Sequence, residues 1–299
     1  MESTISKAKS TERIKGFFVL AVLSIVWGSS FILIKRGLVV YSPDQVATLR
    51  LAISAIAFLP FFLFRFRKID WSKWKALLVV GLTGSGLPAF LFSFAQTKIS
   101  SSVAGILNSL TPLFTFFLGV LLFGSAFQWS RLGGVLLGLI GAILLILYGN
   151  DSGFEGDFWY SMLVILAALC YGTSVNTVGT YLKEMNSITI SAAAFLLIGT
   201  PALVYLFSTD FVTRLTTVPE AWEALGYVAI LSLAGTVLAS IIFFQLVHWT
   251  NAVFASTVAY VIPIVALGWG LLDGESITVF HLLGMVFILA GVYMSRKKR

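Results

Sequence analysis

The stretches "NSLTPLFTFF" at 108–117 and "AYVIPIVALG" at 259–268 decide the fold, because both place a proline at the same position of an apolar run. Pro112 and Pro263 lie 151 residues apart. An ordered series of further pairs keeps nearly the same offset: Ala104 with Ala255, Gly84 with Gly235, Gly134 with Gly284, Gly141 with Gly291, and "WGSS" at 27–30 with "YGTS" at 171–174. The series predicts two repeats, residues 1–150 and 151–299.

The composition is typical of a membrane protein. Of the 299 residues, 58% are hydrophobic and 11% are charged, whereas a soluble domain has about 25% charged residues. The first apolar run, 17–38, is too long for a cleaved signal peptide and is interpreted as a helix. The net charge of +7 comes from Lys and Arg in short loops and tails, so no nucleic-acid partner is expected. The single cysteine, Cys170, excludes an intrachain disulfide.

Charged residues, Gly and Pro divide the apolar runs into ten predicted transmembrane helices. Their ranges are 17–38, 43–65, 74–97, 101–124, 131–149, 157–182, 187–208, 222–247, 252–272 and 279–295. Each repeat then holds five helices, and an odd number means that the second repeat enters the membrane from the opposite side. The sequence therefore predicts an all-α integral membrane protein built from two inverted five-helix repeats.

The distribution of basic residues predicts the orientation in the membrane. With the N-terminus in the cytoplasm, the inside segments hold 15 Lys and Arg residues and the outside segments hold four. Both termini are therefore expected to be cytoplasmic, in a multi-pass protein of the cell (inner) membrane. Inverted repeats suit alternating access, because two copies that face opposite ways provide two related conformations. A duplication kept for folding alone is the alternative.

Four stretches together resemble the drug/metabolite transporter superfamily, EamA type. They are "WGSSFILIK" at 27–35, Arg50, "LNSLTPLFTFFLGVLLFG" at 107–124 and "PIVALGWGLLDGESITVFHLLGMVFILAGV" at 263–292. The resemblance covers nearly the whole chain. It implies ten helices in two inverted halves, a central cavity lined mainly by helices 1, 3, 4, 6, 8 and 9, and export of metabolites such as amino acids, or uptake in some members.

One position departs from the family pattern. The family often has Gly-Glu after the fourth helix, where this chain has Gly124-Ser125. The second half keeps Gly274-Glu275. We interpret Glu275 as a cap at the start of the tenth helix rather than as a substrate ligand.

Arg50 is a permanent charge inside the apolar stretch "ATLRLAISAIAFLPFFLF" at 47–64. Three interpretations stay open. The long side chain could lift the guanidinium to the outer interface, or it could bind helix-end carbonyls or Asp44. It could also clamp a substrate carboxylate, which Arg binds in bidentate fashion. The second repeat has Ala194 at the equivalent position, so only one half carries this charge.

The other candidate site residues are aromatic or uncharged. Trp27 and Tyr171 are symmetry mates, each followed by a glycine, and either pack between helices or form walls of the cavity. The polar candidates for substrate binding within apolar spans are Asn108, Thr111, Asn176, Gln245, Thr257 and Tyr260. Pro112 and Pro263 each remove a helix hydrogen bond and predict either a static kink or a gating bend.

Several classes of chemistry are excluded or disfavoured. No Asp or Glu lies deep in any span, which disfavours proton coupling through a carboxylate. The sequence has no Walker motif, no Ser-His-acid pattern and no metal-ligand pattern, so neither cofactor, metal nor enzyme activity is expected. Gly134, Gly138 and Gly141 form a flat face that suits packing within the molecule or a dimer seam, so a monomer and a homodimer both stay open.

Together these features predict a secondary transporter that binds a small-molecule substrate within the lipid bilayer. The preferred hypothesis is an exporter of small metabolites such as amino acids, which works by alternating access around a mainly uncharged cavity. An uptake carrier of the same fold is the alternative, because gradients and coupling set a carrier's direction. A membrane enzyme or a lipid-handling protein would need a catalytic or metal cluster at one membrane face, and the sequence has none.

Overall fold

The fold is known from a computed structural model, which describes residues 18–125, 127, 129–148, 154–249, 255, 258–259 and 261–296. The described residues form helices and connecting turns, with no strand among them. The chain is therefore an all-α integral membrane protein, as the sequence predicted. Seven helical segments are long and apolar enough to cross a membrane: Phe18–Gly37, Pro43–Lys68, Trp71–Ala95, Ser101–Leu122, Phe158–Tyr181, Ser187–Ser208 and Ala221–Val247.

Three of the ten expected spans correspond to shorter apolar helices in the described part of the chain. They are Leu136–Tyr148, Ile262–Leu272 and Val279–Gly291. The individual α-helices are α2 (Ser30–Gly37), α3 (Pro43–Arg65), α4 (Trp74–Gly81), α5 (Leu87–Ala95), α6 (Ser101–Asn108), α7 (Thr111–Leu122), α8 (Trp129–Tyr148), α9 (Phe154–Tyr181), α10 (Ser187–Ser208), α11 (Phe211–Thr217), α12 (Ala221–Ser232), α13 (Ala239–Trp249), α15 (Ile262–Leu272) and α16 (Val279–Arg296).

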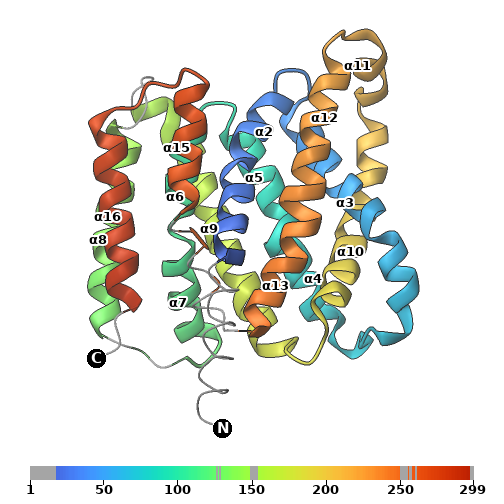
Figure 1. Cartoon of the computed structure of the whole chain (residues 1–299), viewed down its shortest axis with the longest axis horizontal. Helices are drawn as coiled ribbons and strands as arrows, with labels where there is room; N and C mark the ends of the chain where they lie inside the picture. Colours follow the sequence, from blue (N-terminus) through green and yellow to red (C-terminus); the bar gives the residue numbers. More distant parts are fainter. Residues whose placement is uncertain are drawn as a thin grey trace.

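The helices form one elongated bundle, with α8 and α16 at one end and α3 and α10 towards the other (Figure 1). The remaining long helices lie between these two pairs. The glycine face of α8 packs against α16, because a Cβ added at Gly141 would lie 2.7 Å from the carbonyl oxygen of Gly284. This face is therefore used for packing within the molecule.

Two helices begin at the prolines that the sequence singled out. Pro112 lies in the first turn of α7, just after the break that separates α7 from α6, and Pro263 lies in the first turn of α15. A proline leaves the carbonyl four residues earlier without its helical donor. Hydroxyl groups take that role here: Thr111 Oγ1 donates to the carbonyl of Asn108 at 2.7 Å, and Ser109 Oγ donates to that of Ala259 at 3.0 Å. The second of these bonds joins the segment that precedes Pro112 to the segment that precedes Pro263.

Gly28 and Gly172 make equivalent close contacts between different parts of the chain. A Cβ at Gly28 would lie 2.5 Å from Val265 Cβ, and one at Gly172 would lie 2.9 Å from the backbone nitrogen of Thr115 and 3.0 Å from the carbonyl carbon of Phe114. The two partners, Val265 and Phe114, are again 151 residues apart. Small residues allow such close approach of membrane helices, so each glycine that follows the paired aromatic residue lets a helix pack closely on the other half.

Candidate functional site

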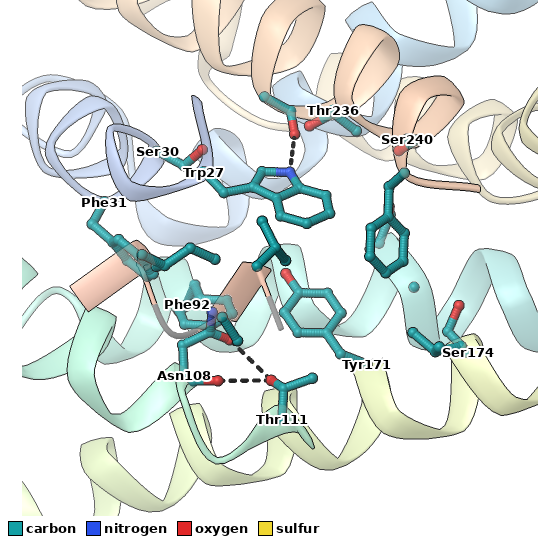
Figure 2. Close-up of a pocket in the computed structure, with 18 of the residues that line it drawn as sticks. Trp27, Ser30, Phe31, Phe92, Asn108, Thr111, Tyr171, Ser174, Thr236 and Ser240 are labelled. Carbon is teal, nitrogen blue, oxygen red and sulfur yellow. Dashed lines mark hydrogen bonds between the residues drawn. The ribbon is translucent and has the colours of Figure 1, made fainter. Parts of the chain in front are cut away.

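A cavity of about 110 Å³ lies where the two halves of the chain meet. Its walls come from helical segments of both halves, including α2, α5, α6, α9 and α13 (Figure 2). The lining side chains are mostly apolar or aromatic, with a few hydroxyl and amide groups and one charged residue. The lining residues are Trp27, Ser30, Phe31, Ile34, Arg50, Gly84, Ser85, Phe92, Asn108, Thr111, Tyr171, Ser174, Val175, Gly235, Thr236, Ser240, Phe243, Phe244, Val258, Ala259 and Ile262.

The paired aromatic residues Trp27 and Tyr171 both line the cavity, and Figure 2 shows their rings extending into it from opposite sides. Trp27 is fixed by a 2.9 Å hydrogen bond from its Nε1 to the carbonyl of Gly235, and its ring lies edge-on to Phe243. The ring of Tyr171 stacks on Phe92 with centroids 6.1 Å apart. Both rings are thus held in defined positions, with apolar surface available to a ligand.

Arg50 projects from α3 into the cavity and is only 8% exposed, so its guanidinium does not reach the outer interface. Its Nε donates to Thr236 Oγ1 at 2.8 Å, and its guanidinium also interacts with the Tyr171 hydroxyl. Asp44 does not pair with it; Asp44 accepts instead from the Tyr205 hydroxyl at 3.1 Å. The structure thus places the charge of Arg50 on the wall of the cavity, and neither at the outer interface nor beside Asp44.

Asn108 and Thr111 lie on the cavity wall at the break between α6 and α7. The Thr111 hydroxyl donates to the backbone carbonyl of Asn108 and lies 3.4 Å from its Oδ1 (Figure 2). The break thus places an amide and a hydroxyl on the wall of the cavity.

The remaining polar candidates have other positions. Asn176 donates to the carbonyls of Thr115 and Gly172 at 2.7 and 2.9 Å, which ties α9 to α7, and it is absent from the lining. Gln245 accepts from Ser187 Oγ at 3.0 Å and likewise does not line the cavity. Thr257 and Tyr260 lie outside the described residues.

Sequence reasoning missed the cavity residues on two π-helical segments, Leu82–Gly86 and Leu233–Leu238. A π-helical turn is frequent at functional sites because it widens the helix and redirects side chains. Gly84 and Gly235, which the sequence had paired, occupy these segments, and Thr236 follows Gly235. The glycine pair was the available signal, since a glycine within an apolar run often marks a close approach or a distortion.

A second polar cluster joins α2, α6 and the turn between α15 and α16. Glu275 accepts from the backbone N–H groups of Ser101 and Ser102 at 2.9 and 3.1 Å, and from Ser102 Oγ at 2.6 Å. Lys35 pairs with Glu275 at 3.1 Å and with Asp273 at 2.5 Å. Glu275 therefore caps α6, in the first half of the chain. The expectation that Glu275 caps the tenth helix was wrong.

The ionisation of Glu275 reflects this cluster. Burial of the side chain opposes the charged form, but the hydrogen bonds from Ser102, Ser101 and Lys35 outweigh it and lower the pKa of Glu275 below its usual value. The carboxylate at the N-terminus of α6 also meets the positive end of the helix dipole. Glu275 is consequently ionised at neutral pH.

Comparisons with known proteins agree with this architecture. The sequence matches the EamA-like transporter family over residues 14–147 and 158–296. It is 31% identical to a protein of Bacillus subtilis named as an uncharacterized transporter, over 89% of this chain and 86% of that one. It is 28% identical to a protein of Salmonella typhimurium named as a probable amino-acid metabolite efflux pump, over 94% of each chain. A solved crystal structure shares the fold with a TM-score of 0.64 and 14% identity, over 94% of this chain and 96% of that one.

Proposed function

The chain belongs to the EamA-like transporter family, and we propose that it exports a small metabolite, such as an amino acid, by alternating access through the cavity. It is a transporter rather than an enzyme, and a multi-pass membrane protein. We place it in the cell (inner) membrane with both termini in the cytoplasm, because the 15-to-4 distribution of Lys and Arg favours that orientation.

The observation that carries the proposal is the cavity itself, which is lined by both halves and contains fixed aromatic walls, a few uncharged polar groups and one buried cation. A secondary transporter binds its substrate at such an interface between repeats. A volume of about 110 Å³ suits a small molecule. The relative named as a probable amino-acid metabolite efflux pump supports both the substrate class and the direction.

Paired contacts support the inverted repeats and the alternating-access mechanism. Gly28 packs on Val265 as Gly172 packs on Phe114, and the cavity-lining π-helical segments include the paired Gly84 and Gly235. Two halves with equivalent contacts across their interface can exchange conformations, so that the cavity opens first to one side and then to the other. The breaks before Pro112 and Pro263 are joined by the bond from Ser109 to Ala259 and would serve as the bending points.

Entrance counterflow in proteoliposomes tests the proposal. Vesicles are loaded with one unlabelled amino acid, and uptake of the same amino acid in labelled form is measured from outside. The measurement is repeated for a panel of apolar, polar and acidic amino acids. We expect accumulation above that of protein-free vesicles for at least one apolar amino acid. No accumulation for any member of the panel, with correctly folded protein in the vesicles, would contradict the amino-acid assignment.

A matched pair of variants tests the route. Ser240 lines the cavity, whereas Thr200 is on the exposed face of α10. Ser240→Phe should fill the cavity and abolish counterflow, while Thr200→Phe, which adds a ring where lipid can accommodate it, should leave counterflow unchanged. Equal transport by both variants would place the substrate path elsewhere. Inside-out vesicles energised with an ion gradient then distinguish the two directions: the labelled substrate accumulates inside the vesicles if the protein exports it from the cell, and is released from preloaded vesicles if the protein takes it up.

A further inference from the structure

Arg50 is a buried cation for which the described part of the chain supplies no carboxylate partner. The ion pairs among the described residues involve Lys35, Arg36, Lys73 and Arg214. The sequence places no Asp or Glu at the depth of Arg50 in any span. A charge removed from water without a counter-charge is unfavourable, and within membranes such residues pair or mark a substrate path. The buried position of Arg50 therefore favours an anionic group that enters the cavity and pairs with it.

The contacts of the guanidinium leave it able to bind such an anion. A guanidinium has five N–H donors. Nε donates to Thr236, and the Tyr171 hydroxyl takes up a further interaction, so donor capacity remains on the side of the cavity. Thr236 belongs to the π-helical segment Leu233–Leu238 and lies 3.3 Å, Oγ1 to O, from the backbone carbonyl of Leu231. Thr236 is thus a positioning residue that fixes the plane of the guanidinium.

The rest of the cavity defines what accompanies the anionic group. Trp27, Phe92 and Tyr171 provide fixed aromatic surface close to Arg50, and Asn108 and Thr111 provide an amide and a hydroxyl. One guanidinium matches the two oxygens of one carboxylate, whereas a doubly charged phosphate calls for further cations. The described lining contains no other charged residue. The matching ligand is a small molecule with one carboxylate and an apolar or aromatic body.

We propose that Arg50, oriented by Thr236, binds the carboxylate of the transported substrate, and that the substrate is a monocarboxylate with an apolar body, such as an apolar amino acid. This assignment rests on the proposed transport function and adds the chemical group that the site selects. It also explains why one half alone carries the charge: the equivalent Ala194 is buried on α10, and a second cation would leave one charge without a partner.

The test compares ligands that differ only in the carboxylate. Counterflow is measured separately for labelled L-leucine, L-methionine and L-phenylalanine, for their labelled carboxamides and for their labelled decarboxylated amines, each with the same unlabelled compound inside the vesicles. For the wild type we expect the acids to drive counterflow and the amides and amines to act at least about tenfold more weakly, since a charge-assisted bond is lost.

Three variants separate the role of the charge from folding. Arg50→Gln should remove the preference for acids over amides, and Arg50→Lys, which keeps the charge but not the fork, should retain a reduced preference. Thr236→Val should raise the KM for acids and leave that for amides unchanged, which a merely structural role would not do. Arg65→Gln is the control, because Arg65 is near the surface and is bonded to Asn186 at 3.3 Å. Size-exclusion profiles and melting temperatures establish that each variant is folded.

The outcomes distinguish the two proposals. Equal counterflow by acids and amides in the wild type, or an undiminished acid preference in folded Arg50→Gln, would overturn the carboxylate subsite and leave the transport function intact. Absence of counterflow with the acids, the amides and the amines alike would overturn the amino-acid transport function, and the subsite with it. Loss of acid counterflow in Arg50→Gln, with transport of amides or amines retained, supports both.

Discussion

Two turns of the chain each place a glycine of positive φ after a helix, but they carry different side chains. Gly124 follows α7 and Gly274 follows α15, and both have positive φ, at 67° and 78°. The next residue in each turn donates its backbone N–H to a glycine carbonyl: Ser125 donates to Gly119, six residues earlier, at 2.9 Å, and Glu275 donates to Gly270, five residues earlier, at 2.8 Å. Ser125 is exposed, however, whereas the Glu275 side chain is only 7% exposed and binds the N-terminus of α6.

The comparison shows that both turns keep a glycine of positive φ, whereas only the second turn carries a buried carboxylate. At the second turn, Glu275 and Asp273 pair with Lys35 and Arg36 of α2, and Glu275 also accepts hydrogen bonds from the first residues of α6. At the first turn, the residue after the glycine is Ser125, which has no carboxylate. Under the proposed alternating-access mechanism the two ends of the bundle are therefore not energetically equivalent, because opening the end that contains Glu275 separates charges.

Removing the carboxylate of Glu275 should produce the largest effect on this comparison. Glu275→Gln leaves the Ser101 and Ser102 N–H groups with a weaker acceptor and Lys35 without one of its two partners. We expect a loss of about 2–3 kcal/mol in the free energy of unfolding, since bonds to a charged group are the strong ones. The measurement is the thermal denaturation of the purified protein in detergent.

Glu223→Gln is the matched control for this variant. Glu223 lies in the first turn of α12, and its hydrogen bond from the Tyr227 hydroxyl is exposed. The same substitution should cost less than about 0.5 kcal/mol there, as expected for an exposed polar pair. Equal destabilisation by the two variants would show that Glu275 does not hold the end of the bundle together.

The two turns also mark the limit of what the sequence could predict. The apolar helices and the position of Arg50 within a span follow from local composition and spacing, and five of the seven predicted substrate-binding residues that the structure describes line the cavity. The role of Glu275 does not follow, because its partner Ser102 is 173 residues away in the sequence and no local pattern specifies that contact. The prediction that Asn176 lines the cavity was wrong for a related reason. A side-chain amide within a span can bond to a neighbouring helix as readily as to a ligand, and Asn176 bonds to α7.

Alanine substitution at the two glycines should affect both turns equally. A Cβ at Gly124 or at Gly274 would meet nothing within 4 Å, so the positive φ is the only cost. That cost is about 1–2 kcal/mol per residue for an L-amino acid in this conformation. Gly226→Ala is the control, since Gly226 lies within α12 with open space around it and a substitution there should be neutral or stabilising. A marked difference between Gly124→Ala and Gly274→Ala in thermal denaturation would show that the two turns are not equivalent.

Neutralising the basic side of the cluster should have a smaller effect. The Lys35 side chain is 38% exposed and that of Arg36 is 49% exposed, so solvent screens both pairs. We expect Lys35→Gln to cost about 1 kcal/mol and Arg36→Gln less, as for partly exposed ion pairs. The deficit of Lys35→Gln should shrink at high salt, where charge interactions are screened. A deficit that does not respond to salt would assign the role of Lys35 to packing instead.

Lowering the pH should progressively remove the stabilisation that the ionised Glu275 gives to the second turn. Because the folded state lowers the pKa of Glu275, its ionised form contributes stability above the pKa of an unfolded glutamate, about 4.3, and this contribution is lost as the pH falls through the lowered value. The gap in melting temperature between the wild type and Glu275→Gln should therefore be largest near neutral pH and narrow below about pH 4. Because the variant shares every other titrating group with the wild type, the gap isolates Glu275, and a gap that stays constant down to pH 3 would mean that the charge of Glu275 does not stabilise the turn.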